Sequence, residues 1–244
     1  MWKKAWFMAR MEIRMVFKSR QVRMIPILVL IMSIVFGGLM TWLILSFGTV
    51  DVFFYTMMMN SIMGVVITLL PIMLPILIAA DSIVGEKERH TLVPLLATPL
   101  SDGELLLGKY LTALIPGLAV AYGNLALAVF IVNGVVLFMA PSLLWIWPDP
   151  LSLIQALVLP ILFSTLAVGM MVIISGRANT VYEAYQTGGI IILPAMVFAY
   201  SGFLAGLNLI ILVVGVIILI IINIVLFRIT VRLFKRDDLM TRTG

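Results

Sequence analysis

Few residues in this chain could carry out chemistry. There is one histidine, His90, and there is no cysteine. A zinc site needs three or four ligands, so His90 alone predicts no metal site. The pattern Gly-x-x-x-x-Gly-Lys-Ser/Thr is absent, so the chain has no P-loop for ATP. Ser201 lies across the membrane from His90 in the topology derived below, which argues against a serine hydrolase. We expect no enzymatic activity, no metal and no cofactor in this chain.

What remains is the chemistry of one charged surface segment. Residues 86–109 read EKERHTLVPLLATPLSDGELLLGK, a polar stretch within a chain that is 63% hydrophobic and only 11% charged. Thr91 can cap a short helix, and that helix must end before Pro99. Ser101 with Glu104 three residues later forms a capping-box pattern, which predicts the start of a new helix. The pattern predicts a helix that leaves the membrane, a short crosswise helix and a helix that re-enters.

Apolar and charged side chains are combined in this short segment. Three of its leucines share one helical face and lie beside a charged patch. Such a surface fits a groove in a soluble partner. It equally fits a helix that lies on lipid, and periodicity alone leaves both interpretations open. The residues assigned to this surface are Glu86, Glu88, Arg89, Thr91, Leu92, Leu95 and Leu96.

Six apolar runs surround the segment and predict an all-α membrane protein. Each run is about as long as a helix must be to cross a bilayer core of about 30 Å. The connections between the runs are too short to form a soluble domain. The runs cover about residues 24–45, 57–80, 105–131, 151–174, 187–205 and 207–229.

Charge predicts how these spans are oriented. All 16 lysines and arginines fall in the two termini or beside the connections on one side of the predicted topology. Basic residues are retained on the cytoplasmic side, so both termini are predicted to be cytoplasmic in a multi-pass protein of the cell membrane. The same flanking positions explain the net charge of +5 through anionic headgroups, and nucleic-acid binding is therefore not expected.

The amino-terminal segment, residues 1–23, is amphipathic. Aromatic and aliphatic side chains recur in it at helical spacing, whereas the basic side chains fall on another stripe. We expect this segment to lie flat along the inner headgroups as an anchor. The other interpretation is an elbow helix that also packs against a partner. The apolar stripe consists of Trp2, Trp6, Ala9, Ile13 and Val16.

The run GEKERHTLVPLLATPLSDGELLLGK resembles the signature of type-2 permeases of ATP-binding-cassette (ABC) transporters. The resemblance covers about residues 81–109 well. In that family this segment is the coupling helix between the second and third transmembrane helices, and it seats on a separate ATPase subunit. The chain departs from the family at Val93 and Pro94, where a glutamate often follows Thr-Leu. A salt bridge at that position is therefore in doubt.

A second patch adds to the resemblance. The sequence ISGRANTVYEA at residues 174–184 is similar to the second inner loop of the family. The resemblance adds Arg177 to the residues expected to contact the ATPase.

The resemblance implies a permease subunit of the exporter class. It implies a homodimer paired with ABC ATPase subunits, which bind the ATP, and a surrounding of membrane lipid. The expected organisation is an elbow helix at 1–23, a six-helix domain at 24–229 with its coupling segment at 81–104, and a cytoplasmic tail at 230–244. The alternative is a membrane scaffold or assembly factor without a transport path. The sequence does not identify a substrate.

Polar residues within the spans are the candidates for a translocation path. Each of them is more often an interhelical hydrogen bond than a substrate contact. No ionisable residue falls in the middle of a predicted span, which disfavours a carrier driven by protons or sodium ions. The candidates are Asn60, Thr68, Asn124 and Ser164.

Overall fold

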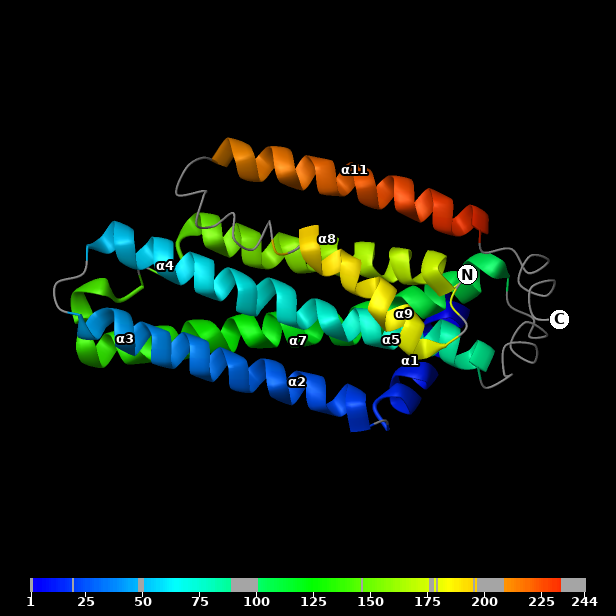
Figure 1. Cartoon of the computed structure of the whole chain (residues 1–244), viewed down its shortest axis with the longest axis horizontal. Helices are drawn as coiled ribbons and strands as arrows, with labels where there is room; N and C mark the ends of the chain where they lie inside the picture. Colours follow the sequence, from blue (N-terminus) through cyan, green and yellow to red (C-terminus); the bar gives the residue numbers. More distant parts are fainter. Residues whose placement is uncertain are drawn as a thin grey trace.

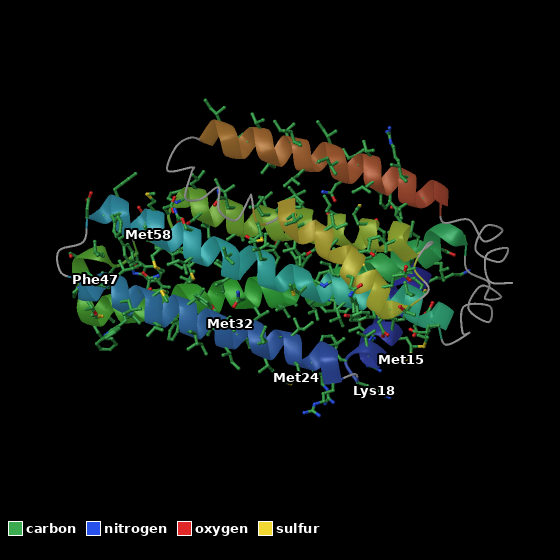
Figure 2. The ribbon with its side chains drawn as sticks, in the orientation of Figure 1. Met15, Lys18, Met24, Met32, Phe47 and Met58 are labelled. Atoms are coloured by element: carbon green, nitrogen blue, oxygen red, sulfur yellow. The ribbon has the colours of Figure 1, made fainter. Side chains whose placement is uncertain are left out.

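The computed structural model shows long helices packed side by side along one common direction, as Figure 1 shows. A shorter helix, α1 (Trp2–Val16), crosses one end of this bundle. We call this the α1 end; Figure 2 places Lys18 there and Phe47 at the opposite end. The structure describes residues 2–18, 20–47, 51–88, 101–145, 147–175, 178, 180–194, 196 and 209–233.

The remaining elements follow along the chain, and the described residues contain no strand. They are α2 (Arg20–Ser33), η1 (Ile34–Leu39), α3 (Met40–Ser46), α4 (Val52–Gly64), η2 (Val65–Leu69), α5 (Leu70–Glu88), α7 (Asp102–Met139), η3 (Pro141–Leu143), α8 (Pro150–Ser175), α9 (Val181–Gly188), η4 (Gly189–Ile191) and α11 (Leu209–Leu233).

Among the described residues, five helical stretches are long and apolar enough to cross a membrane. They match five of the six predicted spans. The predicted fifth span, 187–205, falls in large part outside the described residues, so the count of six stays a prediction. The five stretches are Val22–Ser46, Val52–Glu86, Gly103–Met139, Pro150–Ser175 and Val213–Val231.

Two of these stretches are longer than the sequence analysis predicted. With 38 residues, α7 is about 57 Å long at about 1.5 Å per residue, whereas the bilayer core is about 30 Å thick. The continuous run through α4, η2 and α5 is of similar length. Both helices therefore extend beyond the hydrocarbon. Hydropathy located only their apolar part, because helical structure continues into polar residues.

The start of α7 confirms the predicted capping box. The backbone N–H of Glu104 donates to the Ser101 hydroxyl at 3.3 Å, and the Ser101 N–H donates to the Glu104 carboxylate at 3.0 Å. Two N–H groups at the helix start, which lack partners within the helix, are satisfied in this way.

Two spans contain a turn of π-helix, η1 and η2. The second turn has a clear physical reason. Pro71 lacks an N–H, so the carbonyl of Ile67 four residues earlier has no α-helical donor there. Ile67 lies inside η2, so the missing backbone bond falls in the widened turn.

The core of the bundle is formed by α5, α7 and α8, which pack against one another. Residues of these helices dominate the larger cluster of buried apolar side chains, among them Ile72, Leu105 and Phe163. The outer helices α2 and α11 expose large aliphatic side chains along much of their length. Figure 1 shows α11 along α8 at one edge of the bundle. Exposure of this kind is expected where helices face lipid tails.

Candidate functional site

A buried cluster of charged and polar side chains lies at the α1 end of the bundle. At its centre is Lys109 of α7, whose side chain is only 1% exposed. The Lys109 ammonium contacts the Glu86 carboxylate of α5 at 2.7 Å. It also donates to the backbone carbonyl of Ser82 and to the Ser82 hydroxyl, the latter at 3.2 Å. An ammonium removed from water needs such partners, because isolated burial of a charge is very costly.

Helix α1 contributes the second carboxylate of the cluster. Glu12 Oε1 lies 3.7 Å from Lys109 Nζ, and Glu12 itself is 6% exposed. The Thr112 hydroxyl donates to Glu12 at 3.1 Å, and the Ser82 hydroxyl donates to it at 3.3 Å. We call this set the Lys109 cluster; it consists of Glu12, Ser82, Glu86, Lys109 and Thr112.

The Lys109 cluster joins three helices that are distant in sequence. Glu86 precedes residues 89–100 in the chain and Lys109 follows them, so their ion pair joins the two helices that flank this segment. Glu12 links α1 to the same junction. The described helices on both sides of the segment are thus joined to each other and to α1.

The end of α5 also contacts the second connection at this end. The N–H of Val181 donates to the Glu88 carboxylate at 3.4 Å. Val181 is the first residue of α9, and Thr180 caps this helix by accepting from the Glu183 N–H at 3.2 Å. A carboxylate at a helix N-terminus is electrostatically favourable. Glu88 therefore brings together the two connections that the sequence analysis assigned to one surface.

Most of the predicted surface lies outside the described residues. Glu86 and Glu88 are described: the first is partly buried in the Lys109 cluster, and the second is exposed. Because Glu86 already pairs with Lys109, any contact of Glu86 with a partner would be additional to that ion pair. The others, Arg89, Thr91, Leu92, Leu95, Leu96 and Arg177, are outside the described residues, and their assignment stays a prediction.

Helix α1 buries only part of the expected apolar stripe: Ala9 and Val16 are buried, and Ile13 is half-buried. Trp6, assigned to its apolar stripe, is 49% exposed, whereas Glu12 is buried. The reason is close packing, since α1 lies against α7 and small or flexible side chains permit a short distance between the helices. Met8 approaches Gly108 of α7 in this way. The buried residues of α1 are Ala5, Met8, Ala9, Glu12 and Val16.

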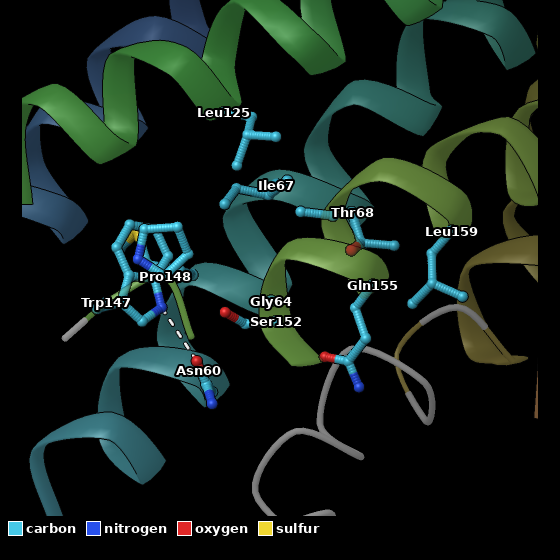
Figure 3. Close-up of a pocket in the computed structure, with 12 residues that line it drawn as sticks. Asn60, Gly64, Ile67, Thr68, Leu125, Trp147, Pro148, Ser152, Gln155 and Leu159 are labelled. Atoms are coloured by element: carbon cyan, nitrogen blue, oxygen red, sulfur yellow. Dashed lines mark hydrogen bonds between the residues drawn. The ribbon is translucent and has the colours of Figure 1, made fainter. Parts of the chain in front are cut away.

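Two of the candidate path residues meet in one small pocket. Asn60 and Thr68 line it together with Gln155 of α8, as Figure 3 shows. The Asn60 carbonyl accepts from the indole N–H of Trp147 at 3.0 Å. The pocket has a volume of about 20 Å³, which is room for about one water molecule. The pocket is too small for a molecule much larger than water, and the path assignment stays a prediction.

The other two candidates lie elsewhere in the bundle. Asn124 of α7 donates to the Val66 carbonyl of η2 at 3.1 Å and is fully buried. Its carbonyl oxygen has no partner within the described residues. Ser164 of α8 is 1% exposed and does not line the pocket of Asn60. The bond of Asn124 is an interhelical hydrogen bond, the alternative role that the sequence analysis gave these residues.

The Lys109 cluster could not be expected from the sequence. As one of 16 basic residues, Lys109 indicates only the inner side, and no sequence pattern gives Glu12 a role. Pairs such as Ser82 and Glu86, one helical turn apart, indicated a shared polar face. Nothing in local spacing indicated that residues 23 and 97 positions away, Glu86 and Glu12, would face Lys109.

Comparison with known proteins identifies the family of this chain. A family model described as "ABC-2 family transporter protein" matches residues 16–185, which is more than half of the chain. A curated protein of Pseudomonas aeruginosa, "Probable ABC transporter permease protein NosY", is 34% identical over 127 residues. That match covers 51% of this chain and 45% of the relative, so it spans less than half of the relative's length.

With its apolar helices, the chain is a multi-pass protein of a cell membrane. The family match and the permease relative both agree with the resemblance found in residues 81–109. The chain belongs to the ABC-2 family of transporter proteins, as a type-2 ABC permease.

Proposed function

We propose that this chain is the membrane subunit of an ATP-driven exporter. Two copies would form the permease, and ATP would be bound and hydrolysed by a separate ABC ATPase subunit, because the chain itself lacks a P-loop. Membership of the family and the permease named among its relatives support this proposal. Both termini and the coupling segment 81–104 would face the cytoplasm, in accord with the distribution of basic residues.

One observation supports the mechanical part of the proposal most directly. The Glu86–Lys109 contact of 2.7 Å joins the helices on either side of residues 89–100. Because this contact joins α5 to α7, a movement of the segment would move the two helices together as one unit. When the ATPase subunits close on ATP, this unit would carry α5 and α7, and a central path would open or alternate between the two sides.

Helix α1 would move with the same unit. Glu12 accepts hydrogen bonds from both α5 and α7, through Ser82 and Thr112. The basic residues of α1, such as Arg10 and Arg14, are exposed. They would hold the helix at anionic headgroups in the role of an elbow. In this way the unit would be guided along the membrane surface while the ATPase moves it.

The proposal is tested by the replacement Leu95→Asp or Leu96→Asp. A carboxylate on the apolar face of the coupling segment should remove the ATPase from purified complexes while the helices stay folded. The control is Val52→Asp, at the first residue of α4 on the opposite end, where the side chain is 46% exposed and an acid is favourable. Undiminished copurification of the ATPase with the leucine variants would contradict the proposal.

Measurement of ATP hydrolysis distinguishes a permease from a membrane scaffold without a transport path. The complex is reconstituted into liposomes with its ATPase, and ATP hydrolysis is compared with that of the ATPase alone. A permease should change the rate of hydrolysis in a manner that Leu95→Asp abolishes. A scaffold should leave the rate independent of residue 95.

A further inference from the structure

A cavity opens between α7, α8 and α11, and no member of the Lys109 cluster lines it. Its volume is about 350 Å³, within the range of about 300–1,000 Å³ that is typical of ligand pockets. One wall is the outer helix α11 from Asn223 to Arg228, and the facing walls are Tyr110 of α7 and Thr165 of α8. The cavity therefore lies along the edge of the bundle where Figure 1 shows α11 beside α8.

The polar groups in the wall of this cavity are already paired. The Thr165 hydroxyl donates to the Asn223 carbonyl oxygen at 2.7 Å, and the Asn223 amide donates to the Leu162 carbonyl at 3.1 Å. The rings of Tyr110 and Phe227 pack edge to face, with 5.8 Å between their centres. The surface left for a ligand is mostly carbon, so it suits an acyl chain better than a sugar or a peptide backbone.

Arg228 contributes a positive charge to this apolar cavity. The residue is exposed and lies three positions before the end of the candidate span Val213–Val231. Helices α8 and α11 contain no acidic residue, and Arg228 forms no ion pair within the described part of the chain. The carboxylates of the Lys109 cluster, Glu12 and Glu86, pair with Lys109 and do not line this cavity. A guanidinium at this depth favours an anion as its partner, and the residues that the structure describes supply none to Arg228.

The order of the lining residues along α11 indicates how a ligand would be oriented in the cavity. Asn223 lies five residues before Arg228, or about 7.5 Å deeper along the helix. The charge thus stands at the headgroup level, and the apolar wall extends below it into the hydrocarbon.

We propose that this cavity binds an anionic phospholipid. The phosphate of the headgroup contacts the guanidinium of Arg228, and an acyl chain occupies the wall formed by Ile224 and Phe227. This site is separate from the coupling surface and does not depend on the proposed transport function. Its occupant comes from the leaflet on the side where the basic residues gather.

Native mass spectrometry of the purified full-length chain tests this site, with phosphatidylglycerol and phosphatidylcholine as the two probes. The wild-type chain should retain phosphatidylglycerol in preference. Arg228→Gln should weaken its retention about five-fold, as expected for one basic residue at an anionic lipid, and should leave phosphatidylcholine unchanged. The matched control is Arg23→Gln, which removes an exposed charge from α2 at the same end.

A second variant tests the cavity itself. Ile224→Trp places a larger side chain in the wall while Arg228 is kept, and it should reduce the retention of phosphatidylglycerol. Three results would each overturn the proposal: equal retention of the two lipids by the wild-type chain, equal losses in Arg23→Gln and Arg228→Gln, or full retention by Ile224→Trp. The circular dichroism of each variant verifies that the helices are intact.

Discussion

Removal of the Lys109 side-chain charge should destabilise the junction of α1, α5 and α7. In Lys109→Met the apolar stem is replaced by one of similar length, but the ammonium is lost. The carboxylates of Glu12 and Glu86 then face each other with no cation between them, at 8% and 20% side-chain exposure. The Ser82 carbonyl loses its donor as well.

The size of the effect follows from these contacts. Removal of one partner of a buried ion pair costs about 3–5 kcal/mol, because the other charge stays buried. Glu86 can regain some water, so we expect about 3 kcal/mol. At about 2–4 °C per kcal/mol for a chain of this size, the thermal midpoint should fall by about 6–12 °C.

The assay is thermal unfolding of the purified chain in detergent, with Lys18→Met as the control for an exposed lysine. The double variant Lys109→Met with Glu12→Gln should recover part of the loss, since it removes one uncompensated charge while the amide oxygen still accepts from Thr112. Equal midpoints for Lys109→Met and Lys18→Met would refute the reasoning. So would a double variant whose loss is the simple sum of two single losses.

Three further changes have definite expected outcomes in the same unfolding assay. Gly117→Ala should lower the free energy of unfolding by about 1–3 kcal/mol, because its methyl group would lie 2.8 Å from Cδ of Pro75. Gly123→Ala, with no atom within 4 Å of the added methyl group, should be tolerated. Similar midpoints for both variants would contradict this packing. Ser101→Ala should cost about 1 kcal/mol by removing the capping box of α7, and an unchanged midpoint would argue against that cap. Asn223→Leu should lower the free energy of unfolding by about 1–2 kcal/mol, because it removes the hydrogen bonds of α11 to Thr165 and to the Leu162 carbonyl. A stabilised variant would show that these bonds are not needed.

Features that depend on neighbouring residues could be predicted from the sequence. The apolar runs located five spans, and the pattern from Ser101 to Glu104 located the start of α7. Both depend on interactions within about one helical turn or on the thickness of the bilayer. The helices extend beyond the predicted spans because polar residues continue an α-helix without a break.

Features that depend on tertiary contacts could not be predicted in this way. The Glu12–Thr112 bond joins residues 100 positions apart, and nothing in either helix specifies the other. Trp147 is 2% exposed and its indole N–H donates to the Asn60 side chain. Its indole N–H needs an acceptor wherever the ring is buried, and only the packing of α4 supplies Asn60.

The proposed function requires a separate ATPase subunit to bind the segment between α5 and α7. The chain contains no cysteine, so single cysteines at Thr91, Leu92, Leu95 or Leu96 can be labelled with a photoreactive thiol reagent without background. A cysteine at Ser142, which is exposed at the opposite end, is the control. In membranes that contain the complex, crosslinks to the ATPase are expected from this segment and none from Ser142. Crosslinks from the segment to lipid alone would contradict it.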